Sequence, residues 1–129
     1  MNRLLSSLLV LLAMGTPSLA FGCGVCIEDK VAATYDHAIV TKAAAKKQLV
    51  VFGAVDGANI NAGQVTKRIV ATAGDIKGVQ RGTTLASVEP PAFSFALDPR
   101  AQTPEAAIAD LQRRLDMPGL RLTFIRALP

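Results

Sequence analysis

Residues Leu49–Val55 read LVVFGAV, and the fold prediction for this chain starts from them. This stretch is apolar, short and rich in β-branched residues, which predicts a buried strand. The residues after it, DGAN at 56–59, predict a loop. Asn61 can then cap a helix, with Gln64 three positions on as its capping-box partner, and Gly74 ends that helix.

Two further strands, a second helix and a last strand are expected downstream. Residues 79–88 predict a strand that Gly82 loosens, and two prolines end it. Residues 92–97, AFSFAL, alternate large and small side chains, which is the two-residue period of a strand with one buried face. Thr103 is followed by proline and glutamate, a strong signal for the start of a helix. Residues 120–124 alternate again and predict the final strand.

The order from Gln48 onwards is therefore strand, helix, strand, strand, helix, strand. This is the split β-α-β arrangement of a ferredoxin-like domain, an α+β fold with one four-stranded antiparallel sheet and both helices on one face. We assign residues 48–129 to this domain. The alternative is a looser α+β domain in which the glycine-broken second strand does not pair. The expected core consists of Val51, Val55, Val65, Ile69, Leu85, Phe93, Phe95, Ile108, Leu111, Leu122 and Phe124.

A further helix is expected ahead of this domain. Residues 27–47, IEDKVAATYDHAIVTKAAAKK, carry Ile27, Val31 and Tyr35 at helical spacing. Acidic residues stand at the start of this segment and lysines near its end, which suits the helix dipole. Together with the cysteines just before it, this helix forms an N-terminal segment over residues 21–47.

Residues 1–20 have the layout of a secretory signal peptide. A short positive start precedes the uncharged apolar run 4–14, and Ser18 and Ala20 occupy the small-residue positions of a cleavage site. The run is shorter than the roughly 20 residues that a transmembrane helix needs. We therefore expect a periplasmic or secreted protein with no transmembrane segment after cleavage. Lipoprotein processing before Cys23 is the alternative, but the bulky Phe21 fits that signal poorly.

Composition and motifs argue against nucleic-acid binding and against an enzyme. The net charge of +4 comes from scattered basic residues, and only 5% of the chain is aromatic, so neither a basic stripe nor a stacking platform is expected. The GANINAG stretch at 57–63 lacks the spacing and the lysine of a phosphate-binding loop. Asp36 and His37 are adjacent, but neighbouring helix residues point apart, and no nucleophile can be placed beside them.

Residues 48–128 resemble the heavy-metal-associated domain, the small fold of copper chaperones and of the N-terminal modules of metal pumps. The resemblance rests on four stretches: LVVFGAV, IKGVQ at 76–80, FALDP at 95–99 and TPEAAIADLQRRL at 103–115. It implies soft-metal binding and a partner of the metal-transport or oxidase-assembly class. Members of this family hold the metal through two cysteines in the loop after the first strand. Here that loop, AVDGANINAGQV at 54–65, contains no cysteine, so those ligands cannot be carried over.

The chain instead holds both of its cysteines upstream, Cys23 and Cys26, in FGCGVCIEDK at 21–30. Three chemistries fit this pair. The two thiolates can clamp a soft ion, either Cu(I), for which two sulfurs suffice, or Zn(II), which needs two more ligands. The pair can exchange with other disulfides, since a helix N-terminus favours the thiolate. It can also form a static disulfide, which an oxidising compartment preserves.

His37, the only histidine, is the first candidate for a third metal ligand. On a continuous helix it lies eleven residues after Cys26, which is close to three turns and therefore on the same face. The same eleven residues separate the two by about 16 Å along the axis. His37 can share an ion with Cys26 only if the helix breaks or if a second molecule supplies the histidine.

The sequence thus predicts an exported soft-metal binding or chaperone protein that uses the CGVC pair. The N-terminal segment is expected either to fold back near the loop 56–61 or to dock on the open sheet face. On that face Ala92, Ser94, Ala96 and Ile125 could accept Ile27, Val31 and Tyr35. The alternatives are an interaction or assembly module with a structural disulfide, and a thiol–disulfide exchange protein.

Overall fold

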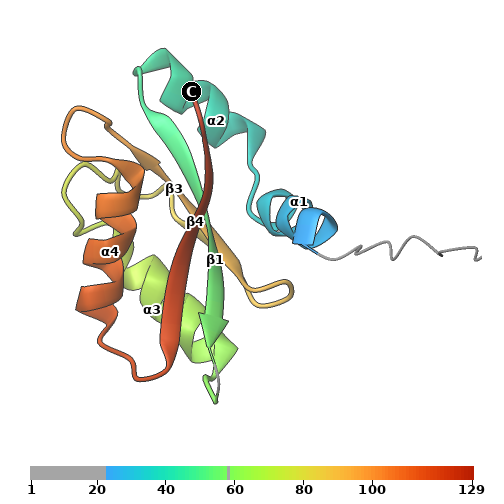
Figure 1. Cartoon of the computed structure of the whole chain (residues 1–129). Coiled ribbons are helices and arrows are strands. Elements are labelled where there is room, and N and C mark those ends of the chain that lie inside the picture. The colour runs from blue at the N-terminus through green and yellow to red at the C-terminus, as the bar shows by residue number, and fades with distance from the viewer. Residues whose placement is uncertain (1–22, 58) are drawn as a thin grey trace, which may run out of the picture.

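A computed structural model describes residues 23–57 and 59–129 of the chain. The expected signal peptide, residues 1–20, lies outside the described residues. The described residues form four helices and four strands, and the strands make up one sheet with helices packed on it (Figure 1). In chain order they are α1 (Cys23–Ala33), α2 (His37–Ala45), β1 (Leu49–Gly57), α3 (Ala62–Ala73), β2 (Leu85–Ser87), β3 (Ala92–Leu97), α4 (Pro104–Leu115) and β4 (Leu120–Leu128).

The four strands form one antiparallel sheet in the order β2-β3-β1-β4. β1 is central, with Val51 opposite Phe95 of β3 on one side and Ala54 opposite Thr123 of β4 on the other. The prediction of an α+β fold with a four-stranded antiparallel sheet is therefore confirmed. β1 and β3 each have a strand on both sides, and helices cover both faces of the sheet, so these two strands are the most buried of the four.

Helices cover both faces of the sheet (Figure 1). The larger core lies between the sheet and helices α3 and α4, and we call this side the α3/α4 face. Its buried residues are Val51, Val55, Val65, Ile69, Ala73, Ile76, Val79, Phe93, Phe95, Leu97, Ala107, Ile108, Leu111, Leu115, Leu120 and Leu122. The smaller core lies under α1 and α2, on what we call the α1/α2 face. Its buried residues are Val31, Ala43, Val50, Phe52 and Ala96.

The starts of α3 and α4 follow the predicted capping chemistry. The side-chain Oδ1 of Asn61 accepts a hydrogen bond from the backbone N–H of Gln64 at 3.0 Å. The Oγ1 of Thr103 accepts one from the N–H of Ala106 at 3.1 Å, and Pro104 occupies the first turn. Each cap satisfies a donor that the helix itself leaves free, so these boundaries were predictable from short motifs.

The predicted strand over residues 79–88 is wrong in its extent. Only Leu85–Ser87 pairs regularly with β3, and Val79 makes a single isolated bridge to Leu97. Gly78 and Gly82 have φ values of 87° and 81°, a left-handed backbone that turns the chain out of the strand conformation. The alternative of a second strand that does not pair is also wrong, because β2 forms the edge of the sheet beside β3.

The single helix predicted over residues 27–47 is instead two helices. α1 ends at Ala33 and α2 begins at His37. Between them Asp36 adopts an extended backbone, and its Oδ1 accepts the N–H of Ile39 at 3.0 Å. Asp36 is therefore an N-cap, and a cap residue begins a new helix rather than continuing an old one.

Nine of the eleven predicted core residues are buried, whereas Leu85 and Phe124 are half-buried.

Gly53 belongs to the same core although it has no side chain. An added Cβ at this position would lie 2.2 Å from Cζ of Phe93, so the phenyl ring occupies the space that any other residue would need. The register of β1 against β4 also shifts between Phe52 and Gly53, which marks a β-bulge at this point.

Candidate functional site

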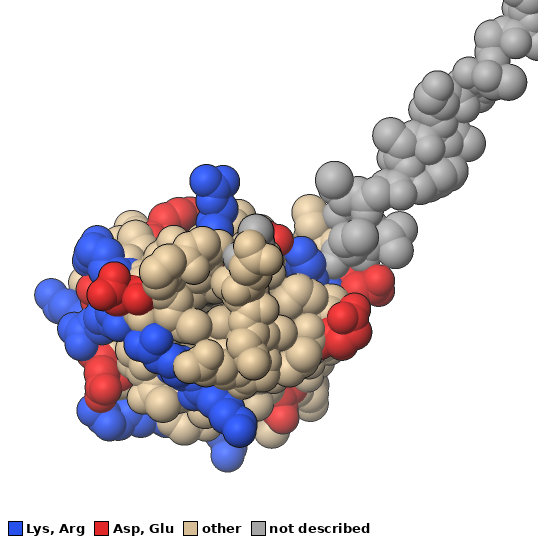
Figure 2. Space-filling view, turned by 90° about the horizontal axis from the view of Figure 1, so that it is seen from below, with Lys and Arg blue, Asp and Glu red and all other residues tan. Residues whose placement is uncertain are grey.

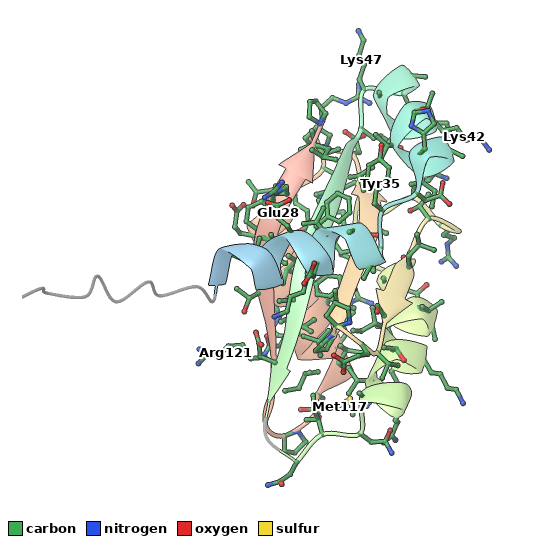
Figure 3. The ribbon with its side chains drawn as sticks, turned by 90° about the vertical axis from the view of Figure 1, so that its right-hand side faces the viewer. Glu28, Tyr35, Lys42, Lys47, Met117 and Arg121 are labelled. Carbon is green, nitrogen blue, oxygen red and sulfur yellow. The ribbon has the colours of Figure 1, made fainter. Side chains whose placement is uncertain are left out.

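Helix α1, which begins with the two cysteines, lies across three strands of the sheet (Figure 3). Glu28 near its start forms an ion pair with Arg126 of β4. Lys30 lies 3.9 Å from Asp56 of β1, and the backbone carbonyl of Thr34, just past the helix, accepts a 2.8 Å hydrogen bond from Ser94 Oγ of β3. Since β4, β1 and β3 are successive strands, α1 starts near the β4 edge and ends over β3.

Among the described side chains of α1, the apolar anchor to the sheet is Val31. Val31 is 8% exposed and belongs to the same cluster as Phe52 of β1 and Ala96 of β3. Ile27 and Tyr35 are 37% and 44% exposed. Of the two expected positions of the N-terminal segment, α1 occupies the one on the sheet face. Of the three residues expected to be buried there, only Val31 is buried. Within the segment 56–61, which the other expected docking involves, Asp56 forms an ion pair with Lys30 of α1.

A buried polar contact fixes the far end of α1. Ser94 and Thr34 are each 2% exposed, and the Ser94 hydroxyl donates to the Thr34 carbonyl. The Thr34 hydroxyl oxygen has no hydrogen-bond partner among the described residues. A buried hydroxyl without a partner opposes folding, so it offsets part of the stability that the Ser94 hydrogen bond contributes.

The CGVC stretch provides the first turn of α1, since the helix runs from Cys23. The side chains of Cys23 and Cys26 lie outside the described part of the structure. Among the side chains that are described, no group of three or more histidine, cysteine, aspartate or glutamate residues gathers in a way that could hold a metal ion.

His37 stands apart from the cysteine turn. It is exposed, it is the first residue of α2, and its Nδ1 lies 3.5 Å from the hydroxyl of Tyr35. The break between α1 and α2 does not return it to the cysteines, because Cys26 and Ala33 are still seven helical residues, or about 10 Å, apart. The structure thus brings His37 together with Tyr35, beyond the opposite end of α1 from Cys23.

The one ion pair of the described residues with a resolved pKa change is remote from α1. Asp98 follows β3, and the hydrogen bonds from the side chain and backbone N–H of Arg100 lower the pKa of its carboxyl group below the usual value of 3.8. The same contact raises the pKa of Arg100. The two side chains pair across the surface turn that follows β3, so their role is structural.

The charged surface is mixed in sign. Figure 2 shows basic and acidic side chains interspersed over the face seen from below.

No helix in the described ranges is both long and apolar enough to cross a membrane. This finding agrees with the expectation of no transmembrane segment, as far as the described residues extend.

Comparisons with known proteins found no match: no family model fits the sequence, and neither a curated protein nor a solved structure is similar to it. They therefore do not identify a heavy-metal-associated domain.

Proposed function

We propose that this chain is an exported, non-enzymatic protein that carries a soft metal ion, Cu(I) before Zn(II), between Cys23 and Cys26. One observation carries the proposal: the CGVC stretch begins a helix that is anchored across three strands of the sheet. Positions three apart on a helix face the same side, so two thiolates there can converge on one ion. Cu(I) accepts soft sulfur ligands, and two of them suffice, whereas Zn(II) needs two further ligands. Two cysteines therefore suit Cu(I) better than Zn(II).

The sheet order supports a ferredoxin-like domain. With β1 between β3 and β4, and with α3 and α4 together on one face, the arrangement agrees with a split β-α-β unit. On this proposal the chain resembles a heavy-metal-associated domain whose loop ligands are missing and whose metal pair stands on an added helix. On the same proposal the chain delivers its ion to a metal-transport or oxidase-assembly protein, which is the partner class that the resemblance implies.

Copper titration of the reduced protein tests the proposal. We expect one Cu(I) per chain, followed by the thiolate-to-copper absorption, and loss of uptake in the variant Cys23→Ser, Cys26→Ser. His37→Gln is the matched control, since two sulfurs suffice and His37 lies beyond the other end of α1. Equal uptake by the serine variant and the unaltered protein would refute a sulfur clamp. Loss of uptake in His37→Gln would instead point to a histidine from a second molecule.

Free-thiol counting separates this proposal from its two alternatives. A metal carrier exported with reduced cysteines yields two reactive thiols after chelator treatment without a reductant. A structural disulfide yields none and resists mild reduction, and an exchange protein yields thiols whose number follows the redox buffer.

The mass of the exported product tests the predicted signal peptide. We expect the mature chain to begin at Phe21.

A further inference from the structure

A cleft on the α1/α2 face has no part in the proposed metal site. It lies between α2 and the turn 80–83, on the β3 side of the sheet, and has a volume of about 240 Å³. Figure 3 shows α2 with its labelled Lys42. The lining residues are Ile39, Lys42, Ala43, Lys46, Gln48, Gln80, Arg81, Gly82, Thr83 and Ala96.

The charge of this cleft is wholly positive. Lys42, Lys46 and Arg81 line it, and no carboxylate does. Within residues 23–57 and 59–129, Asp75 is 2.8 Å from Arg81, whereas neither Lys42 nor Lys46 has a carboxylate within ion-pairing distance. Lys42 and Lys46 are four residues apart on one helix, an arrangement in which like charges repel. The two lysines on this side of the cleft therefore attract an anion, since their positive charges have no carboxylate partner within residues 23–57 and 59–129.

The lysines are not required to cap α2. The carbonyls of its last turn already accept backbone donors: the N–H of Lys46 donates to Lys42 at 3.2 Å, and that of Gln48 donates to Ala43 at 2.8 Å. Helix C-termini often use basic side chains for this purpose, but here the main chain does so. The ammonium groups therefore remain available to a ligand.

The rest of the cleft lining has an apolar part and an uncharged polar part. Ala43 and Ala96 are buried and Ile39 is half-buried, so the base is apolar. Gln48 and Gln80 meet at one end, where the Gln48 Nε2 donates a long 3.4 Å hydrogen bond to the Gln80 Oε1. Thr83 is already committed, because its hydroxyl donates to the Gln80 carbonyl and accepts from the N–H of Ala96.

We propose that this cleft binds a small organic anion. Its oxyanion head, a carboxylate or a phosphate, would lie among Lys42, Lys46 and Arg81, and a short apolar body would cover Ile39, Ala43 and Ala96. The volume is below that of drug-sized pockets, which limits the ligand to a few carbon atoms beyond the head. This site is distinct from the cysteine turn, because its lining residues lie on α2, in the turn 80–83 and on the sheet, and none of the described side chains of α1 is among them.

Two probes test the site and distinguish the heads: butyl phosphate and hexanoate, titrated at constant ionic strength and followed by amide chemical shifts. We expect one of them to bind in the low millimolar range, with shifts concentrated at residues 42–48 and 80–83. Inorganic phosphate and acetate should bind at least threefold more weakly, because they lack the apolar body. Equal affinity for the short and long anions would overturn the proposed apolar subsite.

Lys42→Gln with Lys46→Gln should weaken binding of the better probe at least tenfold. The control is Lys67→Gln with Arg68→Gln on α3, which removes the same charge from the other face and should change the affinity less than twofold. All four positions are exposed or half-buried, so the folds should survive, and the unshifted amide signals report this directly. If both double variants lose affinity equally, or if neither probe binds below 50 mM (an upper limit of about −1.8 kcal/mol), no cleft-specific anion site exists.

Discussion

The two faces of the sheet are built by different means. The α3/α4 face has a large core made of aliphatic and phenyl side chains from two helices and three strands. The α1/α2 face has a small core, and it adds ion pairs, a serine–carbonyl hydrogen bond and a buried hydroxyl without a partner. Apolar burial supplies most of the free energy of folding, so the first face should decide global stability. The second face should decide how firmly α1, and with it the cysteine turn, is held.

The largest expected effect comes from the α3/α4 face. Leu111→Ala removes a fully buried side chain of α4 and should lower the free energy of unfolding by about 2–5 kcal/mol. Val31→Ala on α1 removes two methylene equivalents at the other face and should cost only about 1.5 kcal/mol. Urea denaturation of both variants measures this difference. An equal loss from the two substitutions would contradict the division between a dominant and a minor core.

Gly53 provides the next test, because its lack of a side chain makes room for Phe93. In Gly53→Ala the new Cβ meets the phenyl ring, so the ring or the strand has to move, at a cost of about 1–3 kcal/mol. Thermal unfolding reports the change. Gly63→Ala is the control, since its nearest neighbour outside the helix backbone is at an ordinary 3.5 Å and alanine favours a helix. If Gly53→Ala unfolds like the unaltered protein, Phe93 does not require the glycine.

The polar contact under α1 predicts two changes of opposite sign. Ser94→Ala leaves the Thr34 carbonyl without its donor and should destabilise the fold by about 1 kcal/mol. Thr34→Val removes a buried hydroxyl that has no partner among the described residues and should stabilise it by up to about 1 kcal/mol. Hydrogen exchange of the α1 amides should follow the same order. A destabilising Thr34→Val would mean that the hydroxyl has a partner after all.

The smallest expected effect is the loss of stability at low pH from the ion pair of Asp98 with Arg100. Because Arg100 lowers the pKa of Asp98 in the folded protein, this pair contributes stability at neutral pH. The contribution is lost as the pH falls below the usual value of 3.8 and through the lower folded-state pKa. The difference in stability between the unaltered protein and Asp98→Asn should therefore shrink as the pH falls from 6 to 2. A difference that stays constant over this range would show that the ion pair does not contribute.

The comparison of the two faces also shows what the sequence could predict. Asn61 and Thr103 carry cap signals that depend on residues three positions away, so the starts of α3 and α4 were predicted correctly. Val51, Phe93 and Phe95 follow from strand period, because every second residue points to the same face. Such local rules describe the α3/α4 face well.

The second face depends on information that lies outside any short window. Phe52 was absent from the predicted core, although the uninterrupted run LVVFGAV is typical of a strand buried on both sides. The break at Asp36 was missed because its capping role competes with the helical spacing on either side. The partners of α1 were also beyond prediction, since Glu28 and Arg126 are 98 residues apart.

X-ray absorption at the copper edge of the Cu(I)-loaded protein would identify the atoms that bind the metal. If Cys23 and Cys26, at the start of a helix anchored to the sheet, are the metal ligands, each copper should have two sulfur neighbours, and Cys23→Ser with Cys26→Ser should abolish the sulfur signal. A copper environment made only of nitrogen and oxygen atoms, or a sulfur signal that persists in the serine variant, would contradict the account.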